Sequence, residues 1–210
     1  MKIIDAHVHL VQYIAGTGAG GELRYSGNGM AEYASGERFQ MLPEEFSQGV
    51  VTPEDILGKM DENGVEKAVL LQGNYFGFQN LYSLQAAARY PKRFRAAASY
   101  DPFCRNKEQI REHLFEKLGC NIVKFEVSTG SGLMSNHFTL PLDGEVMRAE
   151  YDYADEHDLV FVIDIGKCQS ESWQVDRLRN AITGHPGMKF VVCHLLAVSM
   201  KDEDKLLEGL

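Results

Sequence analysis

Short apolar runs alternate with helix-like segments along the whole chain. Each run is rich in β-branched residues and is followed by a polar loop and then by a segment with helical periodicity. Because strands that alternate with helices pair in parallel through right-handed crossovers, this pattern predicts an α/β fold with a buried parallel sheet. The predicted strands are 3–8, 67–72, 95–100, 121–126, 159–164 and 189–194.

The predicted helices have recognisable starts and ends. Thr52 followed by Pro53 is typical of a helix N-terminus, and Asn63-Gly64 is typical of its end. Proline or glycine follows most of the other helical segments and stops them. These other predicted helices are 80–90, 106–118, 144–157, 172–183 and 200–210.

Six strand–helix repeats indicate a (β/α)8 TIM barrel of which six repeats are visible. Such a barrel typically needs about 250 residues, and this chain has 210 residues and stops inside a helical segment. We therefore expect one barrel domain over 1–210 that lacks its C-terminal part. The alternative is an open doubly wound sheet that is complete as it stands. A truncated barrel would leave its first and sixth strands unpaired, which favours a homo-oligomer.

A long glycine-rich stretch, 11–51, separates the first strand from the first helix. A loop of that length in a compact domain is usually functional, often as a lid. It leaves the strand at its carboxyl end, where β/α barrels keep their chemistry. Its Gly16–Gly21 segment matches a dinucleotide-binding pattern by letters, but no helix begins after it to hold a phosphate. We therefore expect a loop insertion without a nucleotide.

The charge balance excludes some partners. The formal net charge is −9, and no cluster of lysine and arginine suits a nucleic acid. No stretch reaches the ~18 apolar residues of a membrane span, and the first residues do not form a signal peptide. The four cysteines form no C-x-x-C pair, which is typical of reduced thiols. A cytoplasmic protein with a small-molecule substrate is expected.

His7 and His9 are the first candidates for a functional site. They lie two apart on a predicted strand, so both side chains point to one face, and Asp5 is expected on that face too. Neighbouring imidazoles at the carboxyl end of a barrel strand favour a divalent metal, with zinc–nitrogen bonds of about 2.0–2.1 Å. The alternative is a pair of hydrogen-bonded core histidines.

Other predicted strands also end in polar residues. Lys124 and Glu126 are two apart on the fourth strand, Asp164 closes the fifth strand, and His194 closes the sixth. Because the carboxyl ends of parallel strands meet at one rim, we expect these polar groups, Asp164 and His194 among them, to converge on a catalytic rim. Lys124 is alternatively a salt-bridge partner of Glu126 or Asp164. The candidate substrate-binding residues are Asn74, Tyr75, Lys124, Glu126 and Arg24.

Several segments resemble the amidohydrolase superfamily, in particular its amidohydrolase-2 and aminocarboxymuconate-semialdehyde decarboxylase-like branch. The opening Ile-Ile-Asp-Ala-His-Val-His-Leu is similar to the first strand of that branch, and Phe-Val-Val-Cys-His at 190–194 is similar to its sixth strand. The segments 60–69 and 90–94 resemble its first helix with strand two and its turn before strand three. The resemblance covers the whole chain.

The resemblance implies a metal-dependent enzyme. His7 and His9 would be metal ligands, and His194 a ligand or a catalytic imidazole. The branch usually closes strand five with a histidine, whereas this chain has Asp164. A carboxylate ligand would shift the preference from zinc toward manganese or magnesium, or Asp164 would only orient a histidine. The aspartate that the family carries on strand eight has no counterpart in the chain.

Three functions follow from this interpretation. The first is a metal-dependent hydrolase that acts on a small molecule through a metal-activated water. The second is a metal-dependent non-oxidative decarboxylase of an aromatic or unsaturated acid, in which the ion orients the substrate. The third is a catalytically inactive barrel that binds a ligand, which the altered strand five would favour. We expect one divalent ion, zinc first and manganese or magnesium as alternatives.

Overall fold

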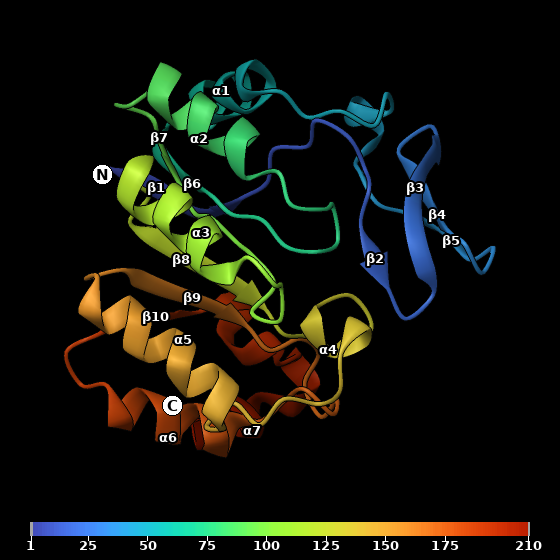
Figure 1. Ribbon diagram of the computed structural model, residues 1–210. Helices are drawn as coiled ribbons and strands as arrows, with labels where there is room; N and C mark the ends of the chain where they lie inside the picture. Colours follow the sequence, from blue (N-terminus) through green and yellow to red (C-terminus); the bar gives the residue numbers. More distant parts are fainter. Residues whose placement is uncertain (1, 210) are drawn as a thin grey trace. The chain divides into compact units, whose positions relative to one another are not determined.

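The computed structural model describes residues 2–209 of the chain. Met1 and Leu210, which end the predicted domain 1–210, lie outside the described residues, as does the last position of the helix predicted over 200–210. The chain divides into two compact units, Met1–Ser99 (unit 1) and Tyr100–Leu210 (unit 2). Each unit has a three-stranded parallel sheet with helices packed on it (Figure 1).

The sheet of unit 1 has the strand order β1–β6–β7, with all strands parallel. Strand β1 (Ile3–Val8) has the predicted bounds, β6 is Val65–Leu70, and β7 is only Phe94–Ala96. Helices α1 (Pro53–Glu62) and α2 (Asn80–Arg89) follow β1 and β6 in the chain. They bury one face of the sheet in an apolar core of Leu10, Met60, Ala68, Leu70, Ala86, Phe94 and Ala96.

Helix α1 begins where its sequence predicts. The Thr52 hydroxyl accepts a hydrogen bond from the Asp55 backbone N–H at 3.1 Å, and the Asp55 carboxylate accepts one from the Thr52 N–H at 2.8 Å. This reciprocal capping box satisfies two N–H groups at the helix start, and Pro53 fits there because that position needs no donor. The helix ends at Glu62 with Asn63 as its C-cap, where Asn63-Gly64 predicts the end.

The long loop insertion predicted over 11–51 contains regular secondary structure. Residues in this insertion form the antiparallel strands β2 (Thr17–Gly18), β3 (Gly21–Gly27), β4 (Met30–Tyr33) and β5 (Arg38–Gln40), followed by the short helix η1 (Glu44–Phe46). Asn28 and Gly29 join β3 to β4 with φ angles of 52° and 74°. Two consecutive left-handed residues make the tight hairpin that Asn-Gly pairs favour, so the signal was present in the sequence.

The sheet of unit 2 has the order β10–β9–β8, again parallel. Its strands are β8 (Ile122–Glu126), β9 (Val160–Asp164) and β10 (Lys189–Val192), each within its predicted range. The predicted helix 106–118 is divided into α3 and a π-helical turn. The helical segments are α3 (Lys107–Arg111), η2 (Glu112–Lys117), α4 (Leu133–Asn136), α5 (Glu145–Glu156), α6 (Val175–Gly184), η3 (Cys193–Ala197), η4 (Met200–Asp202) and α7 (Glu203–Gly209).

Residues 2–209 contain the α/β elements but not the closed barrel that the sequence predicts. Closure needs every strand to have two neighbours, whereas each of the two parallel sheets has three strands and therefore two edges. Strands β1 and β10 are edge strands, and Ile4 and Val191 on them are 59% and 41% exposed. Association of copies through such edges stays a prediction.

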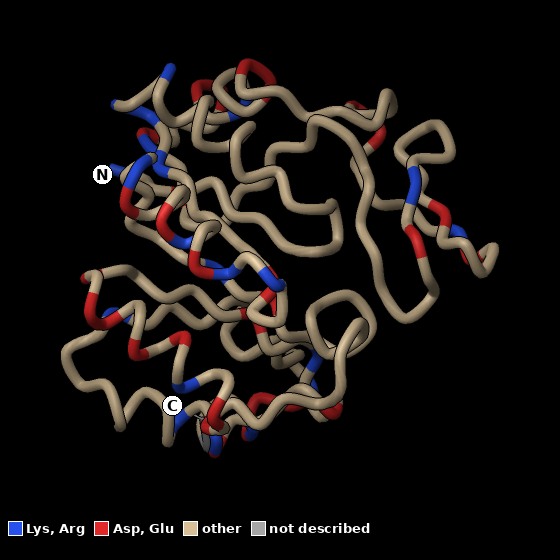
Figure 2. Tube along the Cα trace, viewed as in Figure 1, with Lys and Arg blue, Asp and Glu red and all other residues tan. Residues whose placement is uncertain are grey.

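Charged residues are distributed over both units. Lysine and arginine are interspersed with aspartate and glutamate along the helices (Figure 2). Within the described part of the chain, no helix has the length and apolar character needed to cross a membrane.

Candidate functional site

His7 on β1 and His9, directly after β1, bring their imidazoles together. Their Nε2 atoms are 3.1 Å apart, and the ring centroids are 4.9 Å apart. The Nδ1 atom of His9 lies 3.0 Å from the carbonyl oxygen of Leu71. Because a carbonyl can only accept, Nδ1 carries the hydrogen and Nε2 of neutral His9 carries the lone pair. The backbone therefore fixes His9 in the tautomer that presents Nε2 toward His7.

These donors fit a divalent metal ion. Bonds of about 2.0–2.1 Å from two nitrogens to one ion place the nitrogens ~3 Å apart, close to the observed 3.1 Å. A carbonyl on the outer ring nitrogen, as at His9, is the usual partner of a metal-bound imidazole. Among residues 2–209, however, no group of three or more His, Cys, Asp or Glu side chains is arranged around one point.

Asp5 does not follow the simple alternation expected of it. Strand β1 pairs Asp5 with Ala68 and Val8 with Leu70, and the register shifts between these two pairs. The extra residue between them breaks the alternation of faces, so the expected side of Asp5 cannot be counted back from His7. Its carboxylate instead accepts a hydrogen bond from the His7 N–H at 3.0 Å and holds the backbone there.

In unit 2, Lys124, Glu126 and Asp164 lie on one face of the sheet. Lys124 pairs with Val162 and Glu126 with Asp164 in the parallel register. Lys124 is only 2% exposed and Asp164 9% exposed. Burial raises the pKa of Glu126 above its ordinary value; the Lys124 charge opposes this rise, and the Asp164 charge adds to it. The face thus holds a buried ammonium beside two carboxyl groups.

Asp164 also contacts His194. The Asp164 Oδ2 atom is 3.3 Å from Nε2 of His194, and Oδ1 accepts a hydrogen bond from the Gly166 N–H at 2.9 Å. Strand β10 ends at Val192, so His194 lies in the turn after the strand and not at its predicted end. His194 and the three residues after it all have left-handed φ angles between 48° and 60°, a conformation that costs about 1–2 kcal/mol per residue.

The structure places the three predicted substrate-binding residues of unit 1 in different surroundings. Arg24 on β3 forms a salt bridge with Glu22 and is exposed. Tyr75 stacks on Phe39 of the insertion, with ring centroids 5.7 Å apart. Asn74 is buried in the same loop after β6.

This loop after β6 is joined tightly to the insertion. The Ala15 N–H donates to the Phe76 carbonyl at 3.1 Å. A Cβ on Gly16 would lie 2.1 Å from the Tyr75 carbonyl oxygen, so only glycine allows the two backbones to approach this closely. Phe76, in turn, packs its ring 5.2 Å from that of His9. The insertion therefore supports the loop that covers His9.

Sequence reasoning missed several neighbours of these groups. The Ser128 and Ser131 hydroxyls each donate to Glu126 Oε1 at 3.2 Å. The Cys193 thiol is buried; burial raises its pKa to about 11, an effect that the Lys124 charge opposes. The serines were visible as Ser-x-x-Ser in a glycine-rich loop, but their bonding to Glu126 depends on how that loop turns. The contact of Phe76 with His9 could not be read from the sequence, because it depends on how the loop after β6 folds.

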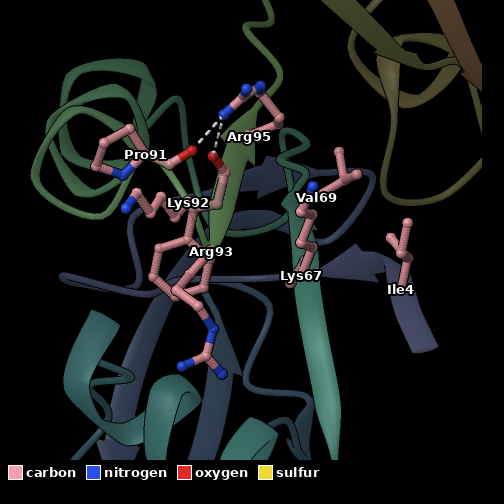
Figure 3. A pocket seen from close by; sticks show the side chains of 9 residues that line it. Ile4, Lys67, Val69, Pro91, Lys92, Arg93 and Arg95 are labelled. Atoms are coloured by element: carbon pink, nitrogen blue, oxygen red, sulfur yellow. Dashed lines mark hydrogen bonds between the residues drawn. The ribbon is translucent and has the colours of Figure 1, made fainter. Parts of the chain in front are cut away.

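A hollow of about 250 Å³ lies elsewhere on unit 1 (Figure 3). It is lined by Ile4, Lys67 and Val69 and by the turn 91–95, near the amino-terminal ends of the strands. Arg95 donates to the Pro91 carbonyl across it at 2.7 Å. The lining has no carboxylate or imidazole, so this hollow lacks the acid–base groups of the candidate site.

Comparison with known families supports the interpretation of the motifs. A family model described as amidohydrolase matches residues 4–202, so the chain belongs to the amidohydrolase family. No curated protein matches the chain. A solved structure described as a TIM-barrel protein, from Bordetella bronchiseptica, matches with a TM-score of 0.59 and 15% identity, over 74% of this chain and 54% of that chain. The α/β fold is therefore the one found in TIM-barrel amidohydrolases.

Other solved structures with this fold are described as enzymes. One is a probable 2-pyrone-4,6-dicarboxylic acid hydrolase from Acinetobacter baumannii with citric acid bound, with a TM-score of 0.65 and 17% identity, over 100% of this chain and 67% of that chain. Another is 2,6-dihydroxybenzoate decarboxylase from Rhizobium, with a TM-score of 0.53 and 18% identity, over 73% and 59%. The chain spans 54% to 67% of the length of three of these structures.

Proposed function

We propose that this chain is part of a metal-dependent amidohydrolase that hydrolyses a small molecule. The observation that carries the proposal is the His7–His9 pair, with Nε2 atoms 3.1 Å apart and His9 oriented by the Leu71 carbonyl. We assign His7 and His9 as metal ligands, and Asp164 and His194 as further ligands or acid–base groups. A bound divalent ion, zinc first with manganese and magnesium as alternatives, would supply a nucleophilic water and polarise the scissile carbonyl.

The buried groups of unit 2 support a role in substrate binding and proton transfer. Lys124 is 2% exposed as a residue. Within the described chain its ammonium group forms no hydrogen bond or ion pair, and it is not among the fully buried atoms without a partner, so it keeps some access to solvent. A largely buried ammonium in this state suits the carboxylate of a substrate. Glu126, with its raised pKa, would hold a proton more readily than an ordinary glutamate and can donate it.

Metal content and turnover test the proposal together. Purified full-length protein is dialysed, its metals are measured, and hydrolysis of 2-pyrone-4,6-dicarboxylate is followed as the probe reaction. Chelation should abolish turnover, and one of zinc, manganese or magnesium should restore it. The His7→Ala, His9→Ala double variant should lose the metal and at least about 100-fold in rate. His113→Ala, at an exposed position of η2, is the matched control.

Full activity of the double histidine variant would sink the hydrolase proposal. Protein that holds no metal and has no affinity for one would favour an inactive ligand-binding barrel instead.

Non-oxidative decarboxylation is the second candidate, because a buried ammonium suits an acid substrate and because solved structures with this fold include 2,6-dihydroxybenzoate and 5-carboxyvanillate decarboxylases. Carbon dioxide released from 2,6-dihydroxybenzoate, without any hydrolysis of the pyrone, would select this candidate.

A further inference from the structure

A second imidazole–carboxylate pair lies outside the residues assigned so far. His137, directly after α4, places Nε2 2.6 Å from Oδ2 of Asp101, which lies in the turn that starts unit 2. Asp101 is itself held, because its Oδ1 accepts a hydrogen bond from the Phe103 N–H at 2.9 Å. The His137 N–H donates to the Leu133 carbonyl at 2.9 Å. The Asp101 carboxylate and the His137 backbone are therefore each held by a further hydrogen bond.

Two other histidines of unit 2 also face carboxylates but use both ring nitrogens. His185 has Asp152 at 3.0 Å from Nε2 and the Ala181 carbonyl at 3.0 Å from Nδ1. His157 has Glu116 at 3.8 Å from Nε2 and the Tyr153 carbonyl at 2.9 Å from Nδ1. Hydrogen bonds hold the His185 ring on both sides, and the His157 ring has a hydrogen bond on one side and an ion-pair contact on the other, as expected of histidines that only stabilise the fold.

The other nitrogen of His137 is different. Nothing within residues 2–209 forms a hydrogen bond with its Nδ1. Over the same residues, the only side-chain polar atoms buried without a partner are the Tyr151 and Tyr153 hydroxyls. Nδ1 of His137 is therefore reached by solvent, in a side chain that is 24% exposed. A carboxylate-oriented imidazole with one open nitrogen is the arrangement that transfers protons in hydrolases.

The surroundings of His137 suit an organic substrate. The Phe103 ring lies 4.4 Å from the imidazole, and Phe138 beside it is 65% exposed. The segment that leaves β8 after Glu126 carries Ser131, whose hydroxyl is bonded to Glu126, and passes through α4 to reach His137, six residues after Ser131. One segment thus connects a carboxyl group of the candidate site to an open imidazole with apolar surface beside it.

We propose that His137 is an acid–base residue for a substrate that lies against Phe103 and Phe138, and that Asp101 is its positioning residue. The inference rests on the proposed hydrolysis for the identity of the reaction. Nδ1 takes a proton from the attacking water as the water oxygen bonds to the acyl carbon. The Asp101 carboxylate stabilises the imidazolium. Nδ1 then returns the proton to the leaving atom as its bond to carbon breaks, which restores neutral His137.

The tautomer of His137 tests the arrangement without any turnover. Neutral His137 should carry its hydrogen on Nε2, which can be read from nitrogen chemical shifts of histidine-labelled full-length protein at a pH of about 8.5. In Asp101→Asn, the amide oxygen should stay on the Phe103 N–H, so the amide nitrogen would face His137. The hydrogen should then move to Nδ1. Asp152→Asn beside His185 is the matched control and should leave His137 unchanged.

Turnover tests the role. With the pyrone dicarboxylate probe, His137→Gln and Asp101→Asn should lower kcat by about 100-fold or more, with KM changed by less than about threefold. His185→Gln should match the wild type, and all variants should keep their metal. Unchanged kcat in His137→Gln, in an enzyme that still depends on His7 and His9, would overturn the inference alone.

If the wild type does not hydrolyse the probe, the tautomer of His137 still tests the proposed Asp101–His137 pair. A hydrogen on Nδ1 of wild-type His137 overturns the pair. A hydrogen on Nε2 that moves in Asp101→Asn supports it.

Discussion

The two units bury polar side chains of different kinds. In unit 1, the buried polar residues of the described chain are all neutral, and its amides Gln72 and Gln79 form a network with backbone groups. Unit 2 buries Arg111, Lys124, Glu150 and Asp164. Around Glu150, the Tyr100 hydroxyl and the Arg111 guanidinium both bond its carboxylate, and Lys107 lies 3.1 Å from it. One unit is thus organised by amides and the other by charges.

This difference predicts which unit's stability should depend more on pH and on single substitutions. A buried amide loses one or two hydrogen bonds when it is removed, whereas a buried ion leaves its partner charged and desolvated. The His7–His9 pair of unit 1 is partly exposed at an edge strand, so it should contribute little to the sensitivity of stability to pH. The buried acidic and basic groups of unit 2 should contribute more.

The largest effect is expected from Glu150→Ala. This change leaves Arg111 buried without its carboxylate, which should lower the free energy of unfolding by about 3–5 kcal/mol. Urea unfolding followed by the fluorescence of Trp173, the single tryptophan, measures it in unit 2. Glu156→Ala, at an exposed position of the same helix, should change stability by less than about 0.5 kcal/mol. Equally small losses of unfolding free energy in both variants would contradict the special cost expected for the buried charges of unit 2.

A smaller loss of stability is expected when the amide network of unit 1 is disrupted. Gln79 accepts from the Gln12 N–H at 2.6 Å and donates to the Tyr13 carbonyl at 2.9 Å. Gln79→Ala should cost about 1–3 kcal/mol, and the loss should be the same from pH 5 to pH 8 because no ion is involved. Circular dichroism during urea titration measures it. A loss that varied with pH would show that unit 1 contains a coupled charge.

Glu126 should make unit 2 less stable as the pH rises. Its pKa is raised in the folded state, so the folded protein binds more protons than the unfolded chain above pH 4.5. Stability due to this group is complete below that pH and falls as the pH passes the raised folded value. Glu126→Gln should flatten that fall. The urea midpoint by Trp173 fluorescence, with chelator present, is the measurement, and parallel curves would contradict it.

The smallest effect is expected at His185. Burial lowers its pKa, but the hydrogen bonds to the Ala181 carbonyl and to Asp152 outweigh burial and raise it. The resulting stability is present below pH 6.5 and is lost as the pH rises through the folded value. Because Asp152 is 68% exposed, Asp152→Asn should cost less than about 0.5 kcal/mol. Thermal unfolding at pH 6 and pH 8.5 should show a loss only at the lower pH.

Most of the regular elements could be predicted from the sequence because their signals are local. The capping box at Thr52 and the β-branched runs of β8 and β9 depend only on neighbouring residues. The insertion was predicted as a long loop because it is rich in glycine and lies between a strand and a helix, while Asn28-Gly29 specified a hairpin within it. Strand β7 is shorter than expected, since an apolar run alone does not show where strand pairing stops.

The site was predictable only where strand alternation applies. The side chains of His7 and His9 point the same way, as strand alternation predicts. The register shift between Asp5 and Val8 means that the same alternation does not place Asp5. His194 is oriented by a left-handed turn, which no periodic pattern encodes. The Asp101–His137 pair joins two loops 36 positions apart. Such pairs arise from tertiary folding, so residue spacing alone could not identify them.

The close approach of the backbones at Gly16 and Tyr75 has a consequence for how this protein can be redesigned. Because no side chain fits at Gly16, the insertion and the loop beside His9 form one inseparable piece. If residues 17–51 alone were transferred to another β/α protein, the base of the insertion would lose the loop 74–77 against which its backbone packs. A transplant should therefore carry 15–16 and 74–77 together, and natural relatives that lose the insertion should also rebuild that loop.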